Sequence, residues 1–338
     1  MKHQNFLLLI SLLPGIFLPA CKKDDNEPQS QSIVSRLYVS NADTDAAVLN
    51  TLIFDPADQE TLKEPYAFNS QLPDGNGILF DPFSGIVFQV SRQNKNVRTF
   101  TVNTDGSLAE VAKTSFIDQS LTSAREMAFD RARKILYIAS NADSSIYVYN
   151  DAHTLTGTVT ASKKLKLNGQ PWGIHLDNDR LFVVIDQARA EVQLFEGASS
   201  LVVGTIIPTK RIILSGAKRL HGITYSSARD ALILTDIGEA TQTGFNSDGA
   251  IHIIDSASTK FTATSSLISP TRTISGSSTG LGNPVDVAWD DRTDKDLIYI
   301  AEKANKKILI FKFANTGNIA PVGYSLLTSP EALYLDAR

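Results

Sequence analysis

Side chains that could bind a ligand or move a proton recur at matching places along this chain, most of them beside a short apolar stretch. Carboxylate and amide oxygens are the groups that Ca²⁺ and Mg²⁺ prefer, and histidine can act as an acid or a base near neutral pH. His221 is the histidine best placed for catalysis, and Trp172 among polar neighbours suits a sugar or a peptide. The candidate ligand-binding residues are Asn76, Arg125, Glu126, Trp172, His221, Asp236, Asp286 and Glu331.

Several other kinds of site are disfavoured by the sequence. The five histidines show no metal-ligand spacing, which argues against a copper or zinc site, and His175 lies in the middle of an apolar run as a core histidine would. The Gly-x-Ser-x-Gly spacing at 276–280 falls in a Gly/Ser-rich loop with no helical pattern after it, so it lacks the strand-to-helix elbow of a serine hydrolase. The single cysteine, Cys21, rules out an intrachain disulfide, and a net charge of −4 argues against nucleic-acid binding.

The candidate residues belong to a repeat. Six stretches share a small or polar residue, alternating apolar residues and usually a final Asp, and all but the last are followed by three further short apolar runs. Units of roughly 40–50 residues with four such strands are typical of a β-propeller. The six stretches are Gly77–Asp81, Glu126–Asp130, Gly173–Asp177, Gly222–Ser226, Asp286–Asp290 and Ala332–Asp336.

The two ends of the repeat are complementary. The last stretch, Ala332–Asp336, reaches the C-terminus with no strand after it, whereas the N-terminal runs 36–40, 48–54 and 63–69 lack a first strand. Joining the two ends would complete a sixth blade and remove the open sheet edges that invite aggregation. We therefore predict an all-β fold: a six-bladed propeller of four-stranded antiparallel blades, with the N- and C-terminal strands sharing one blade.

In a propeller the first strand of each blade lines the central channel, and alternation assigns the side chains. The channel mouth would be lined by Asn76, Arg125, Trp172, His221, Val285 and Glu331, and the next ring by Gly77, Glu126, Gly173, Gly222, Asp286 and Ala332. The long loops 237–249 and 275–283 would lie on the same face, whereas Phe80, Phe129, Tyr225 and Trp289 would pack between blades. The alternative is that the mouth charges simply pair with one another.

Three segments, Pro171-Trp-Gly-Ile, Leu220-His-Gly-Ile and Pro284-Val-Asp-Val, resemble the inner strands of NHL repeats, although the segments beginning at Gly75 and Ala124 depart from that pattern. The six-bladed arrangement is also distantly similar to SMP-30/gluconolactonase-like lactonases. That resemblance implies a divalent cation at the channel mouth, for which Glu331, Asn76, Asn283, Asp236 and Asp286 could supply oxygens. The Glu-Gly-Pro opening motif of those enzymes is missing.

The first residues resemble a bacterial lipoprotein leader. A short apolar run, 6–17, ends at Leu18-Pro19-Ala20-Cys21, which is similar to a lipobox and implies cleavage before Cys21 and its lipidation. Lys22 and the following acidic residues resemble the export signal of surface lipoproteins in Bacteroidetes-type bacteria. We expect a signal peptide at 1–20, a flexible tether at 21–33 and a propeller at 34–338, facing outward from the outer membrane or, alternatively, the periplasm.

These features favour binding over catalysis. We expect a monomer, held at the membrane only by its lipid, that binds a glycan, a peptide or a partner protein through the channel face and needs no cofactor. The alternative is a Ca²⁺- or Mg²⁺-dependent lactonase-like hydrolase at the channel mouth.

Overall fold

The structure, a computed structural model, describes residues 34–45, 47–187, 189–241 and 246–338. Val34–Arg338 form one compact unit. The predicted signal peptide, the tether and Cys21 lie outside the described residues. Among the described residues, no helix has the length and apolar character needed to cross a membrane.

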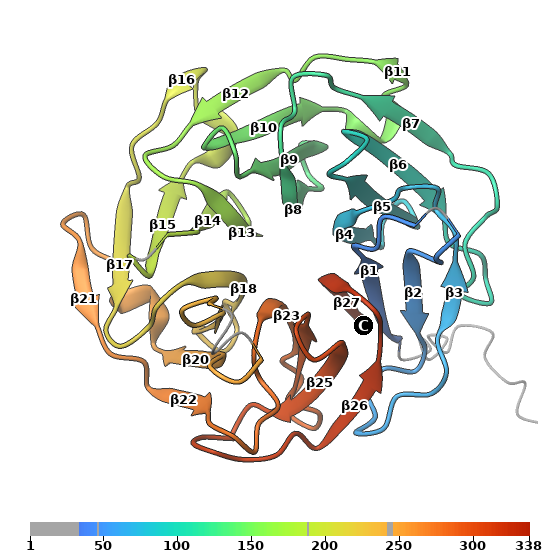
Figure 1. The fold of residues 1–338 in the computed structure, drawn as a ribbon. Coiled ribbons are helices and arrows are strands. Elements are labelled where there is room, and N and C mark those ends of the chain that lie inside the picture. Colours follow the sequence, from blue (N-terminus) through green and yellow to red (C-terminus); the bar gives the residue numbers. More distant parts are fainter. Residues whose placement is uncertain (1–33, 46, 188, 242–245) are drawn as a thin grey trace, which may run out of the picture. The chain divides into compact units, whose positions relative to one another are not determined.

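Six small sheets stand in a ring around an axis, as Figure 1 shows. Each blade takes the name of its innermost strand. The β4 blade contains β4 (Gly75–Asp81), β5 (Ile86–Ser91), β6 (Asn96–Thr101) and β7 (Thr114–Ile117). The β8 blade contains β8 (Ala124–Asp130), β9 (Ile135–Ser140), β10 (Ser145–Asn150) and β12 (Lys163–Lys166). The β13 blade contains β13 (Pro171–Asp177), β14 (Arg180–Ile185), β15 (Glu191–Glu196) and β17 (Lys210–Leu214).

The ring continues with two more blades before it closes. The β18 blade contains β18 (Leu220–Ser226), β19 (Ala231–Asp236), β20 (Ala250–Asp255) and β22 (Arg272–Ser275). The β23 blade contains β23 (Pro284–Asp290), β24 (Leu297–Glu302), β25 (Lys307–Lys312) and β26 (Gly323–Leu326). The helices found in the described part of the chain are the short 3-10 segments η1 (Ala152–Thr154), η2 (Ala198–Ser200) and η3 (Ala257–Thr259).

The closing blade is shared by the two ends of the propeller, as predicted. The C-terminal strand β27 (Pro330–Ala337) is innermost, followed by β1 (Ser35–Asn41), β2 (Thr51–Phe54) and β3 (Tyr66–Phe68). Strands β27 and β1 are antiparallel, with Tyr38 opposite Tyr334. Reciprocal hydrogen bonds between Val34 and Arg338 extend this ladder to the last residue. The sequence prediction of six blades and of this closure is confirmed.

Three blades carry a fifth strand that the sequence did not predict. Strands β11 (Gly157–Thr158), β16 (Gly204–Thr205) and β21 (Ser266–Ile268) pair in parallel with the outer edges of the β4, β8 and β13 blades. These strands have two or three residues each and are mostly exposed, so they show no alternating apolar pattern. Each comes from a later part of the chain and therefore ties neighbouring blades together.

The apolar core lies between blades. Phe80 stacks on Tyr38 of the closing blade with ring centroids 5.2 Å apart, and Phe129 lies 5.3 Å from Phe88 of the β4 blade. Tyr225 lies 5.0 Å from Phe182 of the β13 blade in the same way. Apolar burial of this kind is the main force that holds the blades together.

Every innermost strand contains one extra residue near its start. In the β4 blade, Gly75 pairs with Ser91 and Ile78 pairs with Gln89. Two residues of the inner strand therefore lie between these pairs, against one residue of its neighbour. The same irregularity occurs in all six innermost strands. A β-bulge of this kind re-aims a side chain that strict alternation would turn away. As a result, two consecutive residues of each inner strand can reach the axis.

Candidate functional site

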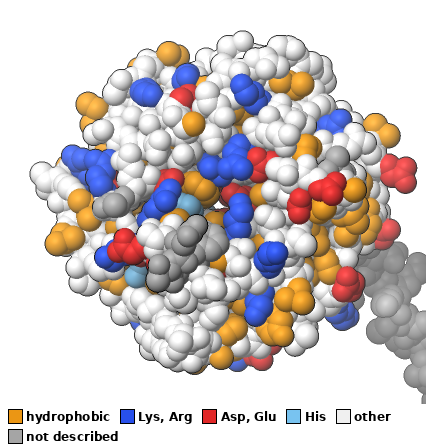
Figure 2. All heavy atoms as spheres, in the orientation of Figure 1, with side chains coloured by type: hydrophobic (Ala, Val, Ile, Leu, Met, Phe, Trp, Pro, Cys, Tyr) orange, Lys and Arg blue, Asp and Glu red, His pale blue; other side chains and the backbone are white. Residues whose placement is uncertain are grey.

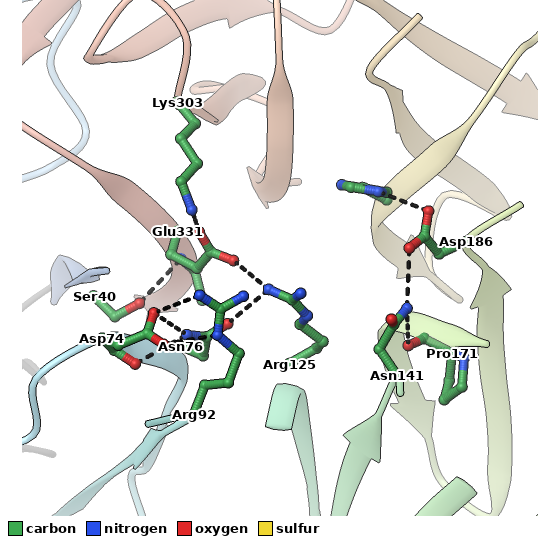
Figure 3. Close-up of polar contacts among 12 residues, drawn as sticks. Ser40, Asp74, Asn76, Arg92, Arg125, Asn141, Pro171, Asp186, Lys303 and Glu331 are labelled. Carbon is green, nitrogen blue, oxygen red and sulfur yellow. Dashed lines mark hydrogen bonds and ion pairs between the residues drawn. The ribbon is translucent and has the colours of Figure 1, made fainter. Parts of the chain in front are cut away.

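The first ring of axial side chains, at the channel mouth, comes from the first residues of the inner strands. Arg125 of β8 reaches across the mouth, where its Nη1 lies 3.4 Å from both Asn76 Oδ1 of β4 and Glu331 Oε1 of β27 (Figure 3). Lys303, just after β24, also bonds Glu331. Although burial opposes ionisation of Glu331, Lys303 and Arg125 hold its pKa below the usual value. The structure therefore brings together three of the predicted mouth residues, Asn76, Arg125 and Glu331.

Two further side chains, from the next two blades, stack with Arg125 at the mouth. The Arg125 guanidinium lies 3.8 Å from the centroid of the Trp172 ring, and Trp172 and His221 stack at 3.7 Å with an interplanar angle of 12°. His221 Nε2 lies 3.0 Å from Asp186 Oδ1. Burial lowers the pKa of His221, so its ring is neutral at pH 7. Trp172 thus lies between a cation and a buried imidazole.

Cationic side chains cover the buried carboxylates of the mouth. Arg92 pairs with Asp74 at 2.7 Å, and Arg219 pairs with Asp186. The side chains of Arg92, Arg219 and Lys303 are 31–39% exposed, whereas the carboxylates that they contact are 2–6% exposed. Figure 2 shows Lys and Arg side chains around the axial depression of this face. The mouth charges therefore do pair with one another, and the outward surface is positive.

Asp236 is the predicted mouth residue that lies apart from this network. Its carboxylate accepts hydrogen bonds from the backbone N–H groups of Lys218, Arg219 and Gly238, at 2.7, 2.8 and 3.0 Å. His252 Nε2 lies 3.3 Å away. Burial opposes its ionisation, but these donors hold the pKa of Asp236 below the usual value. Its contacts indicate a structural role in holding the segment that leads into β18.

The second ring is closed by backbone and contains only two long side chains. A Cβ on Gly173 would lie 2.3 Å from the carbonyl oxygen of His221, and one on Gly222 would lie 2.6 Å from the Cα of Asp286. The inner strands therefore approach too closely for larger residues at these positions. Four of the six positions are Gly or Ala, and the other two are Glu126 and Asp286.

Glu126 and Asp286 belong to the β8 and β23 blades, which stand opposite each other across the ring (Figure 1). The Met127 N–H donates to Glu126 Oε1 at 2.8 Å, and the Leu333 N–H donates to Asp286 Oδ2 at 2.7 Å. Burial raises the pKa of Asp286 to about 7. Burial and the nearby Asp286 carboxylate raise the pKa of Glu126 well above its usual value. Asp286 is buried and Glu126 is half-buried, and two carboxyls that face each other at such a site cannot both ionise, so the pair holds a proton at neutral pH.

A cavity of about 690 Å³ lies on the far side of this carboxyl pair from the mouth. Its lining includes both carboxyls and the turns that follow the inner strands, at 130–133 and 178–179, so it opens on the face opposite the mouth. His175 and Thr224 also line it, between apolar side chains. Burial lowers the pKa of His175 to about 4, so this imidazole is neutral.

The sequence analysis missed several residues of this site. Asp186 is the first residue after β14, Lys303 the first after β24, and Arg92 the first after β5. Each therefore follows the second strand of its blade, a position that aligning the second strands would have revealed. His175 was expected to be a core residue, but it is only partly buried and lines the cavity.

The carboxylates do not suit the divalent cation that the resemblance to lactonases implies. Glu331 lies between two cations, Asp236 is bonded by backbone N–H groups, and Asp286 faces another carboxyl. Within the described ranges, no group of three or more His, Cys, Asp or Glu side chains converges as a metal site would require. The residues that are present therefore do not fit this metal.

Comparison with known proteins finds a partial match to one protein family. Residues 35–201 match a lactonase family. The family model is described as "Lactonase, 7-bladed beta-propeller", and the matched segment is just under half of the chain, from β1 to just beyond η2. The described residues nevertheless form six blades. A search of curated proteins finds no match. The resemblance to NHL repeats stays a prediction.

Solved structures with a similar fold include two candidate 6-phosphogluconolactonases. The one from Bacteroides uniformis is 13% identical with a TM-score of 0.61, and the match covers 90% of this chain and all of that chain. The one from Bacteroides fragilis is 12% identical with a TM-score of 0.60, covering 92% and 100%. A chain of a nidogen–laminin complex is 14% identical with a TM-score of 0.59, covering 89% and 98%. At these identities the likeness shows the fold alone.

Proposed function

We propose that this protein hydrolyses a small hydroxylated lactone in the axial cavity, with Glu126 and Asp286 as the catalytic acid and base. The observation that carries the proposal is the pair of opposed carboxyls at the floor of the cavity. A cavity that combines apolar walls with a few convergent, perturbed titratable groups is the usual form of an active site. The match to a lactonase family model favours ring-opening hydrolysis among the reactions that such a pair could catalyse.

The shared proton supplies both catalytic roles. The ionised carboxyl takes a proton from a water molecule while the water oxygen attacks the lactone carbonyl carbon. The protonated carboxyl gives its proton to the ring oxygen as the carbon–oxygen bond of the ring breaks. One lactone and one water become one hydroxy acid, and the pair again holds one proton with the two roles exchanged.

Binding of a glycan, a peptide or a partner protein at the mouth is supported less well. Trp172 was the residue expected to stack on a sugar, but it already lies between Arg125 and His221. The carboxylates beside Asn76 are also occupied: Asp74 pairs with Arg92, and Glu331 pairs with Lys303. A ligand at this face would have to replace existing contacts, whereas the cavity needs no rearrangement.

Attachment to the cell envelope is part of the proposal. Lipidation at Cys21 would hold the propeller at the outer membrane, facing outward or toward the periplasm, as a monomer without a resident cofactor. The support is the lipobox-like segment before Cys21. Cys21→Ser should move the protein from the membrane fraction to the soluble fraction, and retention of the variant in membranes would contradict lipid anchoring.

The catalytic proposal is tested with glucono-1,5-lactone, by following acid release with a pH indicator and correcting for spontaneous hydrolysis. Glu126→Gln and Asp286→Asn should each lower kcat/KM by roughly 100-fold or more, because each removes one member of the proton-sharing pair. Asp294→Asn, an exposed carboxylate outside the cavity, is the matched control and should keep full activity. Unchanged hydrolysis in both pair variants would refute the proposed site.

A further inference from the structure

The charges that line the axial cavity are unbalanced. The lining contains five carboxyl groups, those of Glu126, Asp130, Asp179, Asp286 and Asp291, against the two guanidinium groups of Arg131 and Arg133. With one proton held between Glu126 and Asp286, two negative charges remain in excess. The imidazole of His175 is neutral and does not change this balance.

The arginines near the cavity are already engaged by acidic groups. Arg131 Nε lies 3.1 Å from Asp81, a carboxylate behind the lining, and Arg133 Nη1 lies 2.9 Å from Asp130. Asp291, by contrast, accepts a hydrogen bond from the hydroxyl of Ser226, and the described residues show no ion pair for its side chain. The excess negative charge therefore faces the cavity at Asp291 and at the carboxyl pair.

We infer that the cavity accepts an uncharged lactone and excludes a phosphorylated one. This inference rests on the proposed function and names its substrate class. The potential of a low-dielectric cleft lined by charges of one sign is focused into the cleft, so it repels a ligand of the same sign. The other cationic groups near the axis, Arg92, Arg125, Arg219 and Lys303, lie at the mouth, on the opposite face of the propeller, and add no positive charge to the cavity lining.

Binding of stable lactams separates this inference from catalysis. The probes are glucono-1,5-lactam and its 6-phosphate, measured by calorimetry with the full-length protein at pH 7.5. The uncharged lactam should bind at least about tenfold more tightly than the dianionic phosphate. Asp291→Asn should reduce this preference to roughly threefold by removing one of the two excess charges. Asp294→Asn, on the same loop but outside the lining, should leave the preference unchanged.

The outcomes are distinct. Equal or tighter binding of the phosphate, a preference that Asp291→Asn leaves unchanged, or failure of both lactams to bind would each overturn the inference. If the uncharged lactam binds preferentially but the lactone is not hydrolysed, the inference on charge stands and the proposed catalysis fails. If glucono-1,5-lactone and its 6-phosphate are hydrolysed equally well and the Glu126→Gln variant is inactive, the proposed catalysis stands and the inference on charge fails.

Discussion

Asp286→Asn should stabilise the protein, and more so as the pH rises. Burial raises the pKa of Asp286 to about 7 from an ordinary value of 3.8. A carboxyl with a raised pKa in the folded state costs stability that is absent below its unfolded pKa and complete above its folded pKa. At 1.36 kcal/mol per pKa unit, the cost above pH 7 amounts to about 4 kcal/mol. Asparagine avoids this cost and keeps an oxygen for the Leu333 N–H.

The groups that face Asp286 set the sign of this effect. Burial dominates and, with Glu331, opposes its ionisation, whereas the N–H groups of Leu333 and Val287 and the hydrogen bond with Glu126 favour it. The assay is urea unfolding of wild type and variant at pH 4, 6 and 8.5. The gain in unfolding free energy should be small at pH 4 and rise to a few kcal/mol at pH 8.5. A gain that is independent of pH, or a loss that grows with pH, would refute the reasoning.

Three other predictions follow from the same structure. Deleting residues 330–338 removes β27 from the closing blade and should abolish soluble folding, whereas a truncated chain with a native circular dichroism spectrum would contradict the closure. Trp172→Ala should destabilise the protein by about 3 kcal/mol through the lost stack but keep lactone kcat within about tenfold, since the cavity lies elsewhere, and a larger loss of kcat would place catalysis at the mouth. EDTA or added Ca²⁺ should change neither the Tm nor the lactonase rate, because the carboxylates do not converge, and a cation-dependent shift of either would show a metal site.

Stability and the proposed function conflict at the axial carboxyl pair. The second ring is otherwise built from Gly and Ala, because the backbones approach closely there. Two acidic side chains at that level are costly to bury, and natural proteins tolerate such cost mainly where a site needs it. This conflict is an independent reason to place the chemistry at Glu126 and Asp286 rather than at the mouth, where each buried carboxylate has a cationic partner.

The repeat, the number of blades and the closure could be predicted from the sequence because they depend on local patterns. Alternating apolar residues mark each strand, and a regular interval marks each blade. The closure is visible in the same local patterns, because the stretch Ala332–Asp336 is a first strand with no strand after it and the run at 36–40 lacks a first strand before it. Strands β11 and β16 could not be predicted, because two exposed residues carry no periodicity and pair only through contacts made by distant segments.

Most of the candidate axial residues were also identified from the sequence, but their partners were not. The repeat aligns Arg125, Trp172, His221 and Glu331 at one level, and the structure brings them together there. Asp236 lies outside that alignment and serves the backbone beside it. Asp186, Lys303 and Arg92 come directly after second strands, so their approach depends on how each blade folds back on itself.

The order of residues along this chain determines that it forms a closed ring of six blades and which positions line its axis, since these follow from periodicity along each strand. Only the tertiary structure decides what the axial residues do. Bulges in the inner strands turn Glu126 and Asp286 toward the axis, and the ring places their blades opposite each other. The shared proton and the cavity beside it exist because segments about 160 residues apart in the sequence meet at the axis of the ring.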